Sequence, residues 1–78
     1  MEVKPDFEVD AKGEHCPVPV LKAKEAINKL TVGQILEVLA TDPASKKDIP
    51  AWAKRAGHEF LGMKEESGVF RYYVKKGK

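Results

Sequence analysis

The sequence predicts an α+β fold, a two-layer α/β sandwich in which two helices lie on one face of a four-stranded mixed sheet. The length of 78 residues suits a single domain, with an ordered core at about residues 6–76. Apolar residues follow strand patterns in four segments and helical spacing in two, in the order βαβαββ. A right-handed crossover makes the first two strands parallel, and two helices on one face are the simplest packing.

The first strand is expected at residues 6–11, where polar and apolar residues alternate. A turn at Gly13 then leads towards Cys16, the single cysteine of the chain. The first helix is predicted from Pro17 to about Leu30. The fixed φ of proline suits the first helical position, and the N–H that it lacks would be unpaired there.

The first helix has a buried stripe at helical spacing, formed by Val20, Ala23, Ile27 and Leu30. Val18 and Leu21 fall outside this stripe and lie within one turn of Cys16. Two interpretations remain open for them. They cover the edge of the helix against a loop, or they form a docking patch for a protein partner.

The second helix is expected to begin at residues 41–43, where Thr-Asp precedes a proline. Pro50 lies too deep for one helix that opens there. We therefore expect a first turn through Lys47, a new cap at Asp48 and a main helix to about Ala56. The predicted buried stripe of that helix consists of Ile49, Trp52, Ala53 and Ala56.

The remaining strands are expected at residues 34–40, 58–65 and 69–76. The first of these is mostly apolar and is predicted to be central in the sheet. The other two form a hairpin, because a turn that contains glycine separates them at residues 66–68. The lysine-rich tail at residues 75–78 is expected to be frayed and solvated.

Cys16 is the candidate reactive residue, and we expect it at the N-cap of the first helix. The helix dipole and free backbone N–H groups there lower the pKa of a thiol. Pro17 and Pro19 have no N–H, so the nearest donors are expected to be those of Val18 and Val20. A thiol of low pKa leaves readily when its adduct is attacked, which suits a carrier better than a hydrolase.

A carrier role also agrees with the absence of a second cysteine from the sequence. No internal thiol could resolve a persulfide on Cys16, so a donor and an acceptor protein are both implied. The alternative interpretation is that Cys16 is a small buried hydrophobic residue. A third is a redox-sensing thiol that forms sulfenic acid.

No complete catalytic set accompanies the cysteine. His15 is its neighbour in sequence, and it is either a general base or a polar residue that contacts partners. His58 belongs to a later element. One cysteine and two histidines are too few for a closed zinc site, so we expect neither a metal nor a cofactor.

Composition excludes several classes of protein. The formal net charge of +2 does not by itself indicate nucleic-acid binding. One cysteine agrees with a reducing compartment, residues 1–6 have no apolar run typical of a signal peptide, and no segment has transmembrane length. We therefore expect a cytoplasmic protein without membrane contact.

The second helical segment carries a cluster of basic residues, Lys46, Lys47, Lys54 and Arg55. Three interpretations are open: a solvated helix face, a surface that steers acidic partners, and a contact with RNA. The motifs typical of RNA-binding domains are absent from the sequence, which makes direct nucleic-acid binding the weaker alternative. That alternative corresponds to a small regulatory or interaction module with a redox-sensitive cysteine.

Residues 10–19, Asp-Ala-Lys-Gly-Glu-His-Cys-Pro-Val-Pro, resemble the signature of the TusA/SirA-like sulfur carriers. That family has Asp, Gly and Cys-Pro-x-Pro at these spacings. The likeness continues through residues 36–52, 57–58 and 70–74, and it covers about residues 6–76. The resemblance implies the βαβαββ fold with a mixed sheet.

The resemblance also implies a persulfide on Cys16. The donor would be a cysteine desulfurase or a rhodanese-type protein, and a downstream protein would accept the sulfur for tRNA 2-thiolation, molybdenum-cofactor supply or sulfur oxidation. Such a chain is a sulfur-relay carrier rather than a turnover enzyme. The residues expected to contact partners surround the cysteine: Gly13, Glu14, His15, Pro17, Val18, Pro19, Leu21 and Lys22. The best-known members have an apolar residue and arginine in place of Glu14-His15, which bears on the choice of partners.

Overall fold

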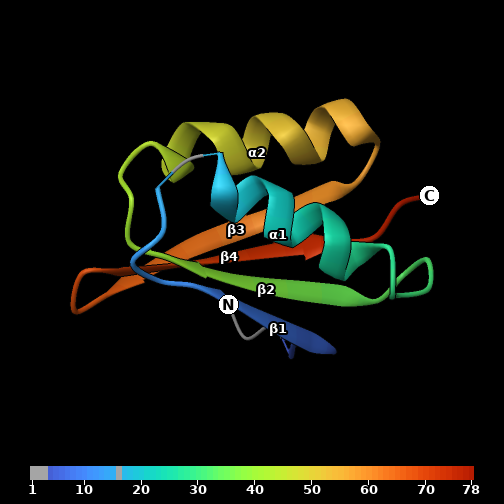
Figure 1. Cartoon of the computed structure of the whole chain (residues 1–78). Coiled ribbons are helices and arrows are strands. Elements are labelled where there is room, and N and C mark those ends of the chain that lie inside the picture. Colours follow the sequence, from blue (N-terminus) through green and yellow to red (C-terminus); the bar gives the residue numbers. More distant parts are fainter. Residues whose placement is uncertain (1–3, 16) are drawn as a thin grey trace.

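The computed structural model describes residues 4–15 and 17–78. In these residues the chain forms one four-stranded sheet with both helices on the same face (Figure 1). The elements are β1 (Phe7–Ala11), α1 (Val18–Ile27), β2 (Ile35–Ala40), α2 (Ser45–Ala56), β3 (Glu59–Glu66) and β4 (Val69–Lys75). The strand order is β1-β2-β4-β3, with β1 parallel to β2 and the other neighbours antiparallel. The predicted two-layer α+β fold is confirmed.

The hydrophobic core lies between the helices and the sheet. β2 is central, as predicted, and its residues Leu36, Val38 and Ala40 are fully buried against the helices. The predicted stripes of both helices supply the opposite side of the core. Their most buried members are Ala23, Ile27, Ile49, Trp52 and Ala53, and Val20, Leu30 and Ala56 pack against these from partly buried positions.

α1 is shorter than predicted at both ends. It begins one residue after Pro17, which occupies the N-cap position, and it ends at Ile27 rather than at Leu30. Beyond Ile27, the backbone N–H groups of Lys29 and Leu30 donate to carbonyls three residues back, at 3.0 and 3.1 Å. This tighter bonding ends the α-helix, although Leu30 still packs against the core.

α2 is one continuous helix, and the predicted break before Asp48 was wrong. The Asp48 N–H donates to the carbonyl of Ala44 at 3.1 Å, so helical bonding runs through the place where a new cap was expected. Pro50 lies inside the helix and has no N–H to donate to the carbonyl of Lys46, four residues earlier. Lys46 is exposed, so water can replace the missing donor there.

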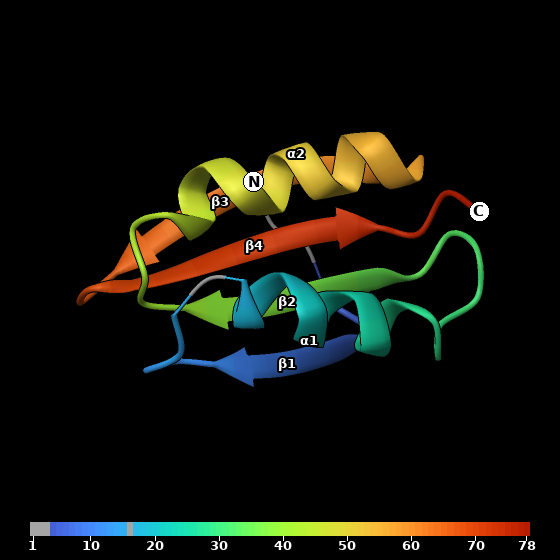
Figure 2. The ribbon, with the colours of Figure 1, turned by 45° about the horizontal axis from the view of Figure 1, so that its top comes forward.

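The C-terminal tail is docked, and the prediction that residues 75–78 fray was wrong. Lys76 exchanges two backbone hydrogen bonds of 2.8 Å with residues 33–34, and the Gly77 N–H donates to His58 Nδ1 at 3.0 Å. Figure 2 shows the tail beside the loop that joins α1 to β2. The sequence alone suggested solvated lysines because the partners of the tail come from distant segments.

The sheet face away from the helices carries a polar network centred on β2. Glu37 is only 5 % exposed, and its carboxylate accepts from Arg71 Nη1 at 3.4 Å. Burial acts to raise the pKa of Glu37, but hydrogen bonds with Glu8 and Tyr73 and the charge of Arg71 outweigh it and lower that pKa. Burial and the bond to Glu37 raise the pKa of Tyr73 to about 12.

One end of the molecule gathers the loops after β1 and β2 and the starts of both helices. β1 and β2 are parallel and end in register at Ala11 and Ala40, so the loops that follow them leave from the same edge of the sheet. Both helices begin at this end, where the β3–β4 turn also lies (Figure 1). No helix in residues 4–15 or 17–78 is long and apolar enough to cross a lipid bilayer.

Candidate functional site

The site is built on the segment between β1 and α1, residues 12–17, which we call the cysteine loop. Cys16 itself lies outside the described residues. The N-cap position predicted for it is taken by Pro17, so that prediction was wrong. The residues before Cys16, 12–15, and Pro17 after it are described, and Pro17 occupies the N-cap position of α1.

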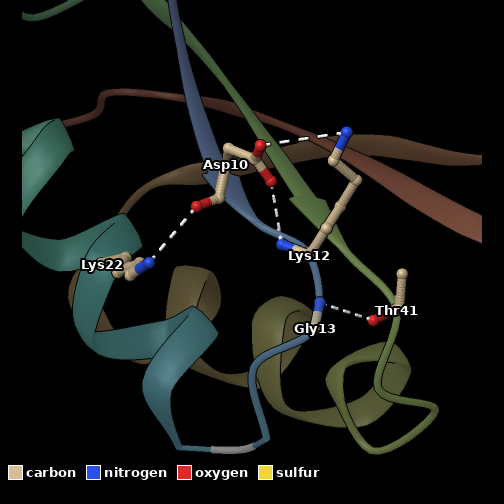
Figure 3. Close-up of polar contacts among 5 residues, drawn as sticks. All are labelled: Asp10, Lys12, Gly13, Lys22 and Thr41. Atoms are coloured by element: carbon tan, nitrogen blue, oxygen red, sulfur yellow. Dashed lines mark hydrogen bonds and ion pairs between the residues drawn. The ribbon is translucent and has the colours of Figure 1, made fainter.

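The loop opens with a tight turn around Asp10 (Figure 3). Asp10 Oδ1 accepts the backbone N–H of Lys12 at 2.9 Å, and Asp10 Oδ2 lies 3.8 Å from the Lys12 ammonium. This arrangement is typical of aspartate in turns. Gly13 follows with φ +81°, a left-handed conformation in which glycine carries no steric penalty.

A hydrogen bond joins the cysteine loop to the end of β2. The Gly13 N–H donates to Thr41 Oγ1 at 2.9 Å, although the two residues are 28 positions apart (Figure 3). The sequence associated Thr41 only with the start of the second helix, so this role was missed. The available signal was its position directly after a strand predicted to be parallel to β1. Asp42 does serve the expected turn, because its Oδ1 accepts the Ala44 N–H at 3.0 Å.

Lys22 ties α1 back to the cysteine loop. Its ammonium lies 3.4 Å from the Asp10 carbonyl oxygen (Figure 3). It also lies 3.3 Å from the Glu14 carboxylate. The sequence placed Lys22 on the polar side of the helix and among the residues that contact partners. The structure brings it together with Glu14, another predicted site residue, across the loop.

The predicted partner-contacting residues differ in exposure. Gly13, His15 and Pro17 are exposed, and Glu14, Val18 and Lys22 are partly exposed. Leu21 is 49 % exposed, which is unusual for a large apolar side chain on α1, whereas Pro19 is buried and packs inward. The exposed apolar surface next to the loop is therefore centred on Leu21, and Val18 contributes only part of its side chain.

One of the backbone donors expected near the sulfur is already used. The Val18 N–H donates to the His15 carbonyl at 2.9 Å, so it is not a free donor. The expectation that this N–H is available to the thiol was wrong. The carbonyl of Pro17 accepts from Leu21 at 3.0 Å, so α1 bonding begins at Pro17.

The two histidines lie at different ends of the molecule. His15 is exposed in the cysteine loop, whereas His58 follows α2 and lies near Ile27 and Asn28 at the end of α1. The 12 residues of α2 span about 18 Å, so His58 cannot reach the loop. Burial lowers the pKa of His58, and the charges of Lys76 and Lys78 add to this effect. His58 therefore has a local structural role.

A groove of about 280 Å³ runs between the two helices and begins beside the cysteine loop. Its walls are Pro17, Val20, Lys24, Asp48, Ala51, Trp52 and Arg55. The lining of the groove combines apolar side chains with charged side chains of both signs. In the described residues, no group of three His, Cys, Asp or Glu side chains is arranged to hold a metal ion.

Comparison with known proteins identifies the family of this chain. Residues 7–76 match the family model described as sulfurtransferase TusA. The sulfur carrier protein TusA of Allochromatium vinosum is 49% identical over 71 residues, which cover 91% of this chain and 93% of that protein. The TusA of Pseudomonas entomophila is 41% identical over 71 residues, covering 91% and 89%.

A solved structure supports the fold independently. The crystal structure of a SirA-like protein from Desulfitobacterium hafniense matches with a TM-score of 0.80 and 27% identity, covering 92% of this chain and 99% of that one. The family match extends over both helices and all four strands and includes the Cys-Pro-x-Pro motif of the cysteine loop. The chain therefore belongs to the TusA family of sulfur carrier proteins.

Proposed function

We propose that the chain accepts sulfane sulfur as a persulfide on Cys16 and transfers it to the thiol of a partner protein. The observation that carries the proposal is the position of the single cysteine in the Cys-Pro-x-Pro motif of a sulfur carrier family. The exposed residues on both sides of it, His15 and Pro17, support access by partner proteins. The carrier needs no cofactor for this chemistry.

Loading is an exchange reaction without net oxidation. The Cys16 thiolate attacks the outer sulfur of a donor persulfide, a new S–S bond forms, and the donor leaves as a thiolate. The outer sulfur retains its proton or releases it to solvent. In unloading, a partner thiolate attacks that same sulfur and Cys16 leaves as a thiolate. With no second cysteine in the chain, no internal disulfide competes with transfer.

Partner docking is supported by the surface around the loop. Leu21 offers exposed apolar area, and the groove between α1 and α2 begins at Pro17, next to the cysteine in sequence. A cysteine desulfurase or a rhodanese-type protein is the proposed donor. The proposed acceptor is a downstream sulfur-relay protein that serves tRNA 2-thiolation, cofactor biosynthesis or sulfur oxidation.

The test is the intact mass of the protein after incubation with polysulfide. Wild-type protein should gain one sulfur atom that a reductant removes, and Cys16→Ser should gain none. The loaded protein, once separated from polysulfide, should lose its added sulfur to an excess of a small thiol. Equal uptake by wild-type and Cys16→Ser would refute the proposal. His15→Gln provides a control in the same loop that should load normally if His15 contacts partners rather than acting as a base.

A further inference from the structure

We infer that Thr41 is a positioning residue for Cys16. Its hydroxyl oxygen accepts the Gly13 N–H at 2.9 Å and so holds the cysteine loop against the end of β2 (Figure 3). The inference rests on the proposed function for the role of Cys16. On this inference, Thr41, which follows β2, helps to set the reactivity of the Cys16 thiol on the cysteine loop.

The support for Thr41 is rigid. It follows Ala40, the fully buried last residue of the central strand. The next residue, Asp42, accepts a bond of 2.6 Å from Ser45 Oγ through its backbone carbonyl. Ser45 Oγ also lies 2.6 Å from the Tyr72 hydroxyl, and both of these residues are fully buried. Thr41 is therefore anchored on both sides to the core.

The cysteine loop, in contrast, is exposed, and a backbone bond of 3.2 Å from the Glu14 N–H to the Ala11 carbonyl joins it to the end of β1. Gly13 is exposed, and nothing lies within 4 Å of the place where its side chain would be. The pairs that Lys12 and Lys22 make with Asp10 and Glu14 have exposed fractions between 40% and 60%. Exposed ion pairs contribute little to holding a segment. The bond to Thr41 is thus the tie from the described part of the loop to the rigid end of β2.

Loss of this tie should change how Cys16 reacts. In Thr41→Val a methyl group replaces the hydroxyl at almost equal volume, and the Gly13 N–H loses its acceptor. The loop then samples more conformations, which changes the surroundings of the thiol. Thr41→Ser keeps the oxygen and should behave as wild type. Thr31→Val makes the same chemical change at the chain's other threonine, beyond the far end of α1.

The experiment measures the rate at which iodoacetamide alkylates Cys16 over a pH range of about 6 to 10, which spans thiol ionisation. Thr41→Val should change the rate near neutral pH by roughly three- to tenfold, about the equivalent of one hydrogen bond, and should move the pH midpoint. Thr41→Ser and Thr31→Val should match wild type. Urea unfolding of each variant checks that the fold is retained.

Several outcomes would overturn the inference. Thr41→Val could alkylate with the wild-type pH profile, or Thr41→Ser could lose as much reactivity as Thr41→Val. A measurement on the wild-type protein adds a test that needs no variant. The Gly13 amide should exchange with deuterium more slowly than an unprotected amide, and unprotected exchange would refute the bond. Failure of wild-type Cys16 to take up sulfur would instead refute the proposed function and leave these results unaffected.

Discussion

The two ends of the helix layer share sequence features but use them differently. Gly13 and His15 precede α1, and Gly57 and His58 follow α2, with both glycines in left-handed conformations at φ +81° and +85°. At the α1 end, the glycine has empty space around it and the histidine is exposed. At the α2 end, Lys78 covers the glycine, and the histidine ring packs 5.7 Å from that of Trp52.

The closed α2 end therefore serves the stability of the fold, whereas the open α1 end carries the candidate site. The α2 end is closed by the C-terminal tail, which adds backbone hydrogen bonds and a hydrogen bond of 2.6 Å from the Lys76 ammonium to the Leu30 carbonyl. The α1 end stays open, which agrees with the access that the proposed persulfide on Cys16 requires. Its order comes from a few hydrogen bonds to a buried support rather than from covering side chains. Three predictions test this comparison.

The largest expected effect is on the buried support beneath the open end. Tyr72→Phe removes the hydroxyl that lies 2.6 Å from Ser45 Oγ, and it should lower the free energy of unfolding by about 1–2 kcal/mol. It should also alter the alkylation rate of Cys16, because Ser45 supports the segment that carries Thr41. Urea denaturation and iodoacetamide kinetics measure the two effects. Tyr73→Phe is the matched control, since Tyr73 bonds Glu37 on the opposite sheet face.

That control separates a general loss of stability from a local one. Tyr73→Phe should destabilise the fold without changing Cys16 alkylation. If both tyrosine variants change alkylation equally, the support under the open end has no special connection to the cysteine loop.

The next prediction compares the two glycines directly. Gly13→Ala and Gly57→Ala should each lower the free energy of unfolding by about 1 kcal/mol, because both force alanine into a left-handed conformation. Lys78 can move away from a new side chain at Gly57, since its flexible end makes the contact. Thermal or urea unfolding measures the cost. Only Gly13→Ala should change the alkylation rate of Cys16, and a change in Gly57→Ala as well would contradict the separation of the two ends.

The smallest expected effect is the pH dependence of the closed end. The pKa of His58 is lowered by burial and by the nearby lysines, whereas the unfolded chain titrates near about 6.5. Above that pH, His58 is neutral in both states and its contribution is fully present. As the pH falls below it, the unfolded state takes up the proton first, so stability decreases. Protonation of Nδ1 would also remove the acceptor for Gly77.

The decrease in the free energy of unfolding at low pH should be below about 1 kcal/mol, because the His58 ring is only partly buried. Urea midpoints between about pH 7 and pH 5 measure it, a window that lies above ordinary carboxylate titration. His58→Gln should flatten this dependence, and His15→Gln, at the open end, should retain it. If His58→Gln keeps the pH dependence of the wild-type protein, the effect comes from other groups.

The sequence by itself determined the elements, their order and the face that each one buries. Apolar spacing is a local property, so it identified Ala23 and Ile27 in α1 and Ile49 and Ala53 in α2 as core residues. The single cysteine in its Cys-Pro-x-Pro motif was equally local, and it indicated both the family and the candidate site. These predictions needed no knowledge of what lies across the molecule.

Tertiary structure alone decided which distant groups meet. The partner of Gly13 is 28 residues away, and its identification requires the register that ends β1 and β2 together. Docking of the tail onto His58 and burial of Glu37 on the uncovered sheet face likewise depend on segments that no local pattern connects. Hydrogen bonds of this kind are set by the three-dimensional positions of single atoms, whereas periodicity reports only which side of an element is apolar.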